Sequence, residues 1–311
     1  MAQIDRETLS KITVYVGEKN YYERNQLRDM FKAHGITQVV CHSSLASLRD
    51  LVFQLPPDIM FISDDFDPEV FSMIAEIRHQ KLGDNPFVLV TMMVSPARPQ
   101  ALDAAIKAGV DDIIVKPMTP DRIRDRLRLV TFHRQPFIVT DDYLGPHRKN
   151  MPLQGRVRRI PVLNTVLEKV HGREFSKDAL REAVQGSLQQ VLQAQLDRQS
   201  FRLGEVCVRV VKAYDNRDIT EEVQADLIML ADVLLQAGEV AVRLRDKGLG
   251  EICTRLSESV RGIADHYDDP TSTEIDLIRK VTGAFKAAMQ SGPSHVDEQP
   301  DAIDLSTLKA S

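Results

Sequence analysis

Four side chains of the types that phosphoryl transfer uses each follow a short apolar run of the sequence. They are two carboxylates, a hydroxyl and an ammonium group: Glu18, Asp64, Thr91 and Lys116. Carboxylates hold Mg²⁺, which prefers oxygen ligands, and the cation neutralises charge that develops on a transferred phosphoryl group. A lysine and a hydroxyl can bind the phosphoryl oxygens. The set therefore suits phosphoryl transfer, provided that the fold brings its members together.

The first 131 residues alternate between apolar runs and amphipathic stretches, which predicts a parallel sheet. The apolar runs are Ile12–Val16, Gln38–Cys41, Ile59–Ser63, Phe87–Thr91 and Asp112–Val115. Runs that are nearly continuous in Val and Ile are typical of strands covered on both faces. Helical patterns that end at breakers lie between them, such as Tyr21–His34 before Gly35. Five strands alternating with five helices predict an α/β doubly wound, parallel five-stranded sheet.

The predicted topology explains why the four polar residues matter together. The first, third, fourth and fifth strands are expected to end at Glu18, Asp64, Thr91 and Lys116. In doubly wound sheets the active site lies beyond the carboxyl ends of the strands, so these ends should share one rim. An aspartate alone at a strand end is usually a helix cap, and Lys-Pro is a common dipeptide. Their joint occurrence at the ends of these strands is far more specific.

This arrangement resembles the receiver domains of two-component response regulators over roughly the first 131 residues, through its F-I-S-D strand end and its V-K-P motif. The resemblance implies that Asp64 accepts a phosphoryl group and that Glu18 and Asp64 bind Mg²⁺. It further implies that the Thr91 hydroxyl moves toward the phosphoryl group and that Lys116 forms an ion pair with it. A cis peptide between Lys116 and Pro117 is expected in the family.

The chain departs from the family pattern near the predicted metal site. Gly17 stands where the first acid of the metal-binding pair is usual, so Mg²⁺ binding should be weak and Gly17→Asp should tighten it. The M-P-x-M-D-G turn is absent after Asp64. Either Asp65 or Asp67 supplies a compensating carboxylate, or both are ordinary acids of a surface loop.

Two further departures concern the predicted response to a phosphoryl group. Met92 follows Thr91 where a small residue is usual, and it is expected to crowd the entrance of the site. Ile113 occupies the position where a switch tyrosine or phenylalanine commonly sits. The response should therefore be smaller and more graded than an aromatic switch gives.

The pattern predicts four segments: a receiver domain over 10–134, a basic linker over 135–172, a helical bundle over 173–291 and a disordered tail over 292–311. Proline and glycine punctuate the linker, which also carries the Y-x-G-P-x-R sequence from Tyr143 to Arg148 and further arginines up to Arg159. A basic run of this kind is either a solvated surface or a docking strip for an acidic partner or for the receiver's own acidic face.

The helical half carries apolar stripes at helical spacing, with leading residues Leu180, Val223, Ile252 and Ile275. At least four amphipathic helices with short connections predict an all-α bundle that serves protein interaction or dimerisation, including a homodimer. The sequences G-G-D-E-F, E-A-L and G-x-S-x-G, which mark enzymatic output domains, are absent. The chain is therefore not expected to be an enzyme.

Composition restricts the partners. Hydrophobic residues make up 43% and charged residues 27%, and the formal net charge is −5, which gives no general attraction to nucleic acid or to an anionic membrane. The start of the sequence lacks the apolar core of a signal peptide, and a cytoplasmic location is expected. Cys41, Cys207 and Cys253 are far apart and are expected to be reduced, packed thiols.

Two functional hypotheses follow from these observations. The first is a response regulator that receives a phosphoryl group on Asp64 from a histidine kinase or a phosphotransfer protein and signals through its helical domain to an unidentified protein partner. The alternative is a pseudo-receiver scaffold that binds partners without phosphorylation. Intact Asp64, Thr91 and Lys116 favour the first hypothesis, and Gly17 and Met92 favour the second.

Overall fold

The structure is a computed structural model, and it describes residues 4–96, 98–149, 151 and 157–291. The chain divides into two compact units, Met1–Val191 and Leu192–Ser311. We call them the sheet unit and the helical unit. The predicted tail, 292–311, lies outside the described residues.

The sheet unit contains five parallel strands in the order β2-β1-β3-β4-β5. Their bounds are β1 Thr13–Gly17, β2 Gln38–His42, β3 Ile59–Ser63, β4 Leu89–Val94 and β5 Asp112–Val115. The helices are α1 Arg6–Ser10, α2 Tyr21–Ala33, α3 Leu45–Gln54, α4 Val70–Arg78, α5 Gln100–Lys107 and α6 Pro120–Phe132. The predicted doubly wound α/β sheet is confirmed, and its strand order is that of receiver-like folds.

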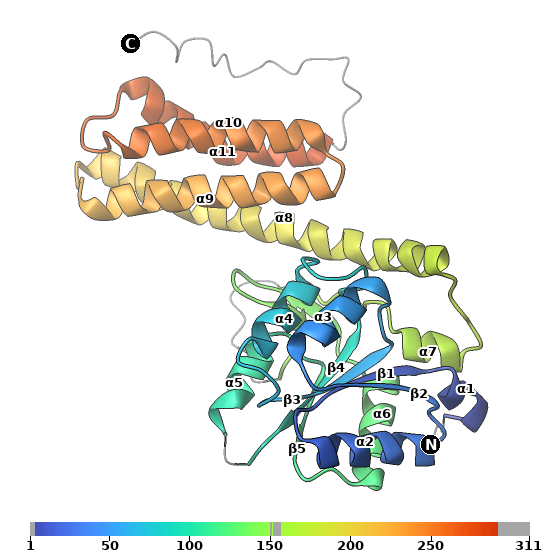
Figure 1. Ribbon diagram of the computed structural model, residues 1–311. Coiled ribbons are helices and arrows are strands. Elements are labelled where there is room, and N and C mark those ends of the chain that lie inside the picture. Colours follow the sequence, from blue (N-terminus) through green and yellow to red (C-terminus); the bar gives the residue numbers. More distant parts are fainter. Residues whose placement is uncertain (1–3, 97, 150, 152–156, 292–311) are drawn as a thin grey trace. The chain divides into compact units, whose positions relative to one another are not determined.

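Helices cover both faces of the sheet (Figure 1). The alternation of side chains along the strands produces two cores, one on each face. Met60 and Ile62 of β3 pack with α3, α4 and α5, whereas Ile59 and Phe61 pack with α2 and α6. Because successive strand residues point to opposite faces, all four side chains are buried and the strand reads as continuously apolar. Side-chain caps fix where the helices begin, as at Asn20, which accepts hydrogen bonds from two amides of α2.

The described residues of the segment expected to be a basic linker form part of the sheet unit. It contains the hairpin of β6 Phe137–Val139 and β7 Leu144–Pro146, followed by α7 Thr165–Val170. Val166 of α7 is fully buried in the core beside α2 and α6. The structure thus differs from the expectation for 135–172, because apolar residues spaced between the arginines supply a packing face that the basic composition obscured.

The helical unit is formed by the second part of α8 and by three further helices. The bounds are α8 Lys177–Asn216, α9 Glu221–Arg243, α10 Lys247–Ala264 and α11 Ser272–Ser291. The stripe that begins at Leu180 continues along one helix of 40 residues, which starts in the sheet unit and extends into the helical unit. Gly238 lets α9 and α10 approach closely, since a Cβ atom there would lie 3.1 Å from Cβ of Cys253. The predicted all-α second domain is confirmed, with the division after Val191 instead of after residue 172.

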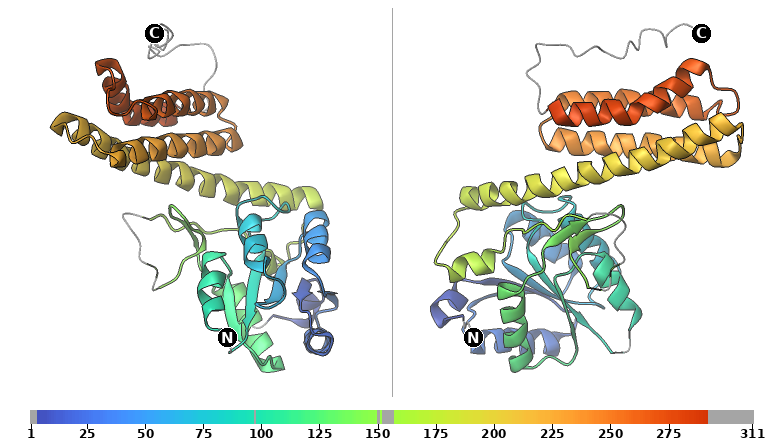
Figure 2. Two further views of the ribbon diagram at one scale, coloured as in Figure 1. Left: turned by 60° about the vertical axis from the view of Figure 1, so that its left-hand side comes forward. Right: turned by 180° about the vertical axis from the view of Figure 1, so that it is seen from behind.

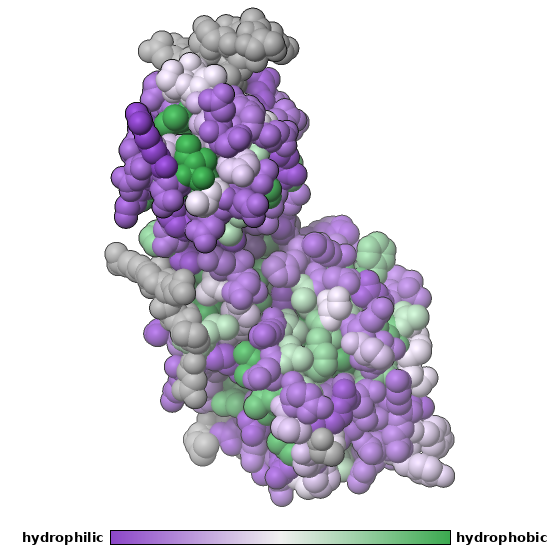
Figure 3. Space-filling model, turned by 90° about the vertical axis from the view of Figure 1, so that its left-hand side faces the viewer, coloured by the Kyte–Doolittle hydropathy of each residue, from purple (hydrophilic) through white to green (hydrophobic). Residues whose placement is uncertain are grey.

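On the face drawn in Figure 3, hydrophilic residues dominate the surface of each unit, and small apolar patches lie among these hydrophilic residues. None of the helices that the structure describes combines the length and the apolar character that a membrane span requires.

Candidate functional site at the carboxyl ends of the strands

Glu18 lies immediately after β1 and is almost completely buried, with 1% of its surface exposed. Its Oε1 accepts a hydrogen bond of 2.8 Å from the amide of Asn20, and its Oε2 accepts from the Ser63 hydroxyl and from Lys116 Nζ. Burial raises the pKa of Glu18, but the hydrogen bonds from Lys116 and Ser63 lower it by more than burial raises it. The pKa of Glu18 therefore lies below its ordinary value. Both carboxylate oxygens of Glu18 therefore accept hydrogen bonds from other groups of the chain.

Lys116, directly after β5, is held by carboxylates from the start of the chain. Its Nζ lies 2.8 Å from Glu18 Oε2, 2.9 Å from Glu23 Oε2 and 3.8 Å from Asp65 Oδ1. Burial lowers the pKa of Lys116, but the hydrogen bonds to Glu18 and Glu23 raise it above the ordinary value. The Lys116–Pro117 peptide is cis, as expected. The ammonium group is thus fixed by Glu18 and Glu23.

Asp64 follows β3 and is held by a different set of groups. Its amide donates to the carbonyl of Met93, and its Oδ1 accepts from the amide of Ser95 at 3.2 Å. Arg98 Nε lies 3.9 Å from Oδ2, which is buried and has no hydrogen-bond partner. Burial is the main cause that raises the pKa of Asp64. The carboxylate is enclosed, with 1% of the residue exposed.

Thr91 lies inside β4, whereas the sequence pattern predicted it at the strand end. The strand continues through Met92 and Met93 to Val94, because the apolar run does not stop at Thr91. Thr91 pairs with Phe61 on one side and Asp112 on the other, one pleat below the level of Ser63. Its hydroxyl is buried without a partner, and no hydrogen bond joins it to Asp64 or Lys116. The rim position next to Asp64 belongs to Val94 and Ser95.

The residues at this rim do not fit a bound Mg²⁺ ion. Both oxygens of Glu18 are taken, and Asp64 faces the cationic side chain of Arg98. Of the two candidate compensating acids, Asp65 lies within reach of Lys116, and Asp67 accepts a hydrogen bond from the amide of Glu69. Within the described part of the chain, no group of three or more His, Cys, Asp or Glu is arranged to hold a metal.

The other two departures from the family pattern have structural consequences. Met92 is fully buried in the core that packs against α3, α4 and α5, so it fills the interior and does not crowd an entrance. Ile113 is partly buried and packs against the same core.

A second polar cluster, which the sequence did not reveal, lies at the other end of β5. Asp111 binds Arg78 through Oδ2 and Arg134 through Oδ1, each at 2.8 Å, and all three side chains are buried. The guanidinium carbons of both arginines lie near the ring of Phe137 in β6, at 5.3 Å for Arg78 and 5.1 Å for Arg134. The two consecutive acids at 111–112 were the available signal, but the buried cationic partners of Asp111 are Arg78 at the end of α4 and Arg134 after α6.

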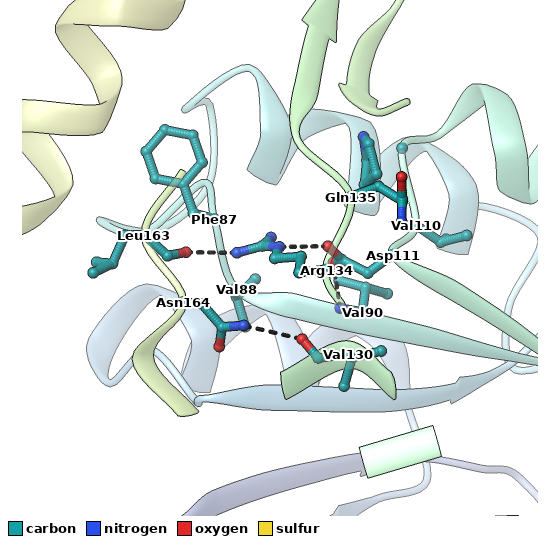
Figure 4. Close-up of polar contacts among 12 residues, drawn as sticks. Phe87, Val88, Val90, Val110, Asp111, Val130, Arg134, Gln135, Leu163 and Asn164 are labelled. Carbon is teal, nitrogen blue, oxygen red and sulfur yellow. Dashed lines mark hydrogen bonds and ion pairs between the residues drawn. The ribbon is translucent and has the colours of Figure 1, made fainter. Parts of the chain in front are cut away.

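This buried cluster also secures the segment that leads to α8 (Figure 4). Arg134 Nη1 donates to the carbonyl of Leu163 at 2.5 Å, and Asn164 donates to the carbonyls of Val130 and Thr131. The amide of Leu163 in turn donates to the hydroxyl of Ser187, which belongs to the part of α8 in the sheet unit. Direct contacts thus join Asp111, just before β5, to Ser187 in the part of α8 that belongs to the sheet unit.

The Y-x-G-P-x-R sequence acts as a packing element. Tyr143 Oη donates to the carbonyl of Pro146, and Arg148 Nη2 donates to the carbonyl of Val110 at 2.5 Å. A Cβ atom at Gly145 would lie 2.8 Å from Cα of Gly109, so only glycine permits the hairpin to approach the sheet unit this closely.

No family model matches the chain, and no curated protein matches it. Among solved structures, it is similar to an orphan response regulator of H. pylori, at 18% identity over 38% of this chain and 95% of that chain, with a TM-score of 0.33. It is similar to a signal receiver domain from Clostridium thermocellum, at 22% identity over 38% and 96%, with a TM-score of 0.34. Full-length FixJ from B. japonicum matches at 12% identity over 88% and 98%, with a TM-score of 0.32.

Proposed function

We propose that this chain is a receiver-fold signalling protein that works through constitutive protein contacts, without phosphorylation of Asp64. The observation that carries the proposal is the pairing of Lys116 with Glu18 and Glu23, 2.8 and 2.9 Å away, in place of Asp64. The lysine that would neutralise a phosphoryl group is already neutralised by two carboxylates from the β1–α2 region.

Access and charge at Asp64 support the same proposal. A phosphodonor must reach a carboxylate oxygen, and Mg²⁺ must offset the negative charge of donor and acceptor. Asp64 is enclosed, burial raises its pKa, and both oxygens of Glu18 already accept hydrogen bonds within the chain.

The contacts around Arg134 indicate how the sheet unit would act on the output. Asp111 forms an ion pair with Arg134, and Arg134 donates a hydrogen bond to the carbonyl of Leu163. The amide of Leu163 donates to the hydroxyl of Ser187 in α8. Because α8 continues into the helical unit, a partner bound to the sheet unit could bias the helical unit through this one helix. The helical unit would then bind an unidentified protein partner.

Phosphoryl acceptance by Asp64 is the second candidate, and one observation favours it. Oδ2 of Asp64 is buried without a hydrogen-bond partner, with Arg98 Nε 3.9 Å away. An orphaned carboxylate oxygen beside a guanidinium is a position where a phosphoryl group, delivered by a histidine kinase or a phosphotransfer protein, would gain a partner.

Hydrogen exchange of the full chain, with and without beryllofluoride and Mg²⁺, separates the two candidates. Our proposal predicts unchanged exchange in 59–66, 91–95 and 113–117, and the same result for Asp64→Asn. Protection of these segments in the wild type that is lost in Asp64→Asn would favour phosphoryl acceptance and contradict the proposal.

A further inference from the structure

A cleft of about 740 Å³ lies between α1, α2 and α6 within the sheet unit. The three helices lie together in the lower part of that unit in the right-hand view of Figure 2. None of the described residues that line the cleft belongs to the candidate site at the strand ends. Small-molecule sites have volumes of roughly 300–1,000 Å³, so the cleft has the size of such a site.

The lining of the cleft is positively charged. Arg6 of α1 lines it together with Arg124 and Arg128, which are four residues apart and therefore share one face of α6. Asp5 is the one carboxylate among the described residues of the lining. Its two oxygens already accept hydrogen bonds of 2.8 Å from the amide and the hydroxyl of Thr8. The three arginines thus give the cleft an excess of positive charge.

Two of these arginines have no compensating acid in the part of the chain that the structure describes. Arg124 pairs with Asp121 at 2.9 Å, whereas Arg6 and Arg128 form no ion pair with any described residue. Nε of Arg128 is buried and has no hydrogen-bond partner there. Buried donors in proteins are almost always hydrogen-bonded, so an unpartnered guanidinium nitrogen beside a cleft indicates a missing acceptor.

Contacts between the helices form the walls of the cleft. A Cβ atom at Gly35, just after α2, would lie 2.9 Å from Cγ of Arg6, so the stem of Arg6 packs against this glycine. Nε2 of His34 donates a hydrogen bond of 2.8 Å to the carbonyl of Pro120, which joins the end of α2 to the start of α6. The end of α2 therefore contacts both helices that supply the arginines.

We propose that the cleft binds a small organic phosphate of nucleotide size. A guanidinium group binds phosphate oxygens through paired hydrogen bonds and presents its donors in a fixed plane. Leu9 and Leu127 add apolar surface to the same lining. The phosphate groups would bind at Arg6 and Arg128, and the organic part would contact the two leucines. This binding does not depend on the state of Asp64.

Isothermal titration calorimetry of the full chain at low salt tests the proposal, with ADP and inorganic pyrophosphate as probes. ADP should bind saturably and more tightly than pyrophosphate, because it adds an organic part to the same phosphate chemistry. Combining Arg6→Gln with Arg128→Gln should weaken ADP binding at least about tenfold. Arg158→Gln combined with Arg159→Gln removes the same charge from exposed positions outside the cleft, and it should change the affinity less than about twofold.

Ala33→Glu supplies an independent variant. It places a carboxylate at an exposed position of the cleft lining and keeps all three arginines. It should also weaken ADP binding, while the urea midpoint of unfolding stays close to that of the wild type.

Three results would overturn the proposal. The first is the absence of saturable ADP binding below about 1 mM. The second is an equal affinity of the cleft variant and the Arg158/Arg159 control, which would place the bound anion elsewhere. The third is pyrophosphate binding as tight as ADP binding, which would contradict an organic ligand that contacts Leu9 and Leu127.

Discussion

Lys116 Nζ lies 2.8 Å from Glu18 Oε2, and no hydrogen bond or ion pair joins Lys116 to Asp64. The two groups that a phosphoryl site must bring together are thus in separate hydrogen-bonding sets at the end of β3. Ser63 belongs to the Glu18 set, and the next residue, Asp64, belongs to the set of Ser95 and Arg98. Neighbouring residues of an extended chain point to opposite faces, which explains the separation.

Removing the Lys116 ammonium group should destabilise the sheet unit. Lys116→Met leaves the buried Glu18 carboxylate without its cation, which we expect to cost about 1–3 kcal/mol at neutral pH. Urea denaturation followed by near-ultraviolet circular dichroism measures this loss. Lys107→Met, at an exposed position of α5, is the control and should change stability little. Equal stabilities of the two variants would contradict the assigned role of Lys116.

The cost of Lys116→Met should depend on pH. The pKa of Glu18 is lowered in the folded chain, because hydrogen bonds from Lys116 and Ser63 outweigh burial. Its ionised form therefore contributes stability above the unfolded pKa of about 4.3, and this contribution is lost as pH falls through the folded pKa. The difference between wild type and variant should shrink below about pH 4. A pH-independent difference would show that Glu18 is not the group affected.

Asp64→Asn should stabilise the fold at neutral pH. Burial raises the pKa of Asp64, so stability is present while the carboxyl is protonated and is lost as pH rises through the folded pKa. Asparagine does not ionise, so the variant does not lose this stability as pH rises. We expect its free energy of unfolding to exceed that of the wild type by up to about 1 kcal/mol at pH 7, with no difference below about pH 4. Thermal unfolding at several pH values tests this expectation, and a less stable variant at pH 7 would contradict it.

Gly17→Asp should destabilise the chain without creating a magnesium site. A Cβ atom at Gly17 would lie 3.1 Å from Ile62 Cγ2 and from Phe66 Cδ1. Crowding of this kind costs about 1–3 kcal/mol. Gly17→Ala carries the same Cβ atom and should show much of the same loss. The sequence alone favoured tighter Mg²⁺ binding by Gly17→Asp, and calorimetric titration that found it would restore that expectation.

Asp111→Asn should be the most damaging of these substitutions. The carboxylate compensates two buried guanidinium groups, those of Arg78 and Arg134. Leaving buried charges without a partner costs about 3–5 kcal/mol. Asp103→Asn, on the exposed side of α5, is the matched control. A loss below about 1 kcal/mol in chemical denaturation would show that the cluster does not hold the hairpin and α7 in place.

The sheet and its order could be predicted because strand character and helix ends are local properties. Buried strands are continuously apolar, and caps such as Asn20 and glycines such as Gly35 mark where helices begin and end. The end of β4 could not be located in the same way. Thr91 is a polar residue inside an apolar run, and only the pairing with Phe61 and Asp112 shows that the strand continues past it.

The residues that lie at the candidate site could be predicted from the sequence, but the contacts between their side chains could not. Glu18, Asp64 and Lys116 do lie at the ends of their strands. Which carboxylate the lysine contacts depends on Glu23 in α2 and on the direction in which Asp64 points, and neither follows from spacing. The segment 135–172 was harder to interpret, because its basic residues were compatible with a solvated strip or a docking strip. Arg158 and Arg159 are exposed, whereas Arg148 donates a hydrogen bond to the carbonyl of Val110.

The most direct test of the central claim is the intact mass of the full chain after incubation with a small phosphodonor and saturating Mg²⁺, repeated with a cognate histidine kinase. Our account predicts no added phosphoryl group, because Asp64 is enclosed and Lys116 is held by Glu18 and Glu23. A base-labile gain of one phosphoryl group that disappears in Asp64→Asn would contradict it.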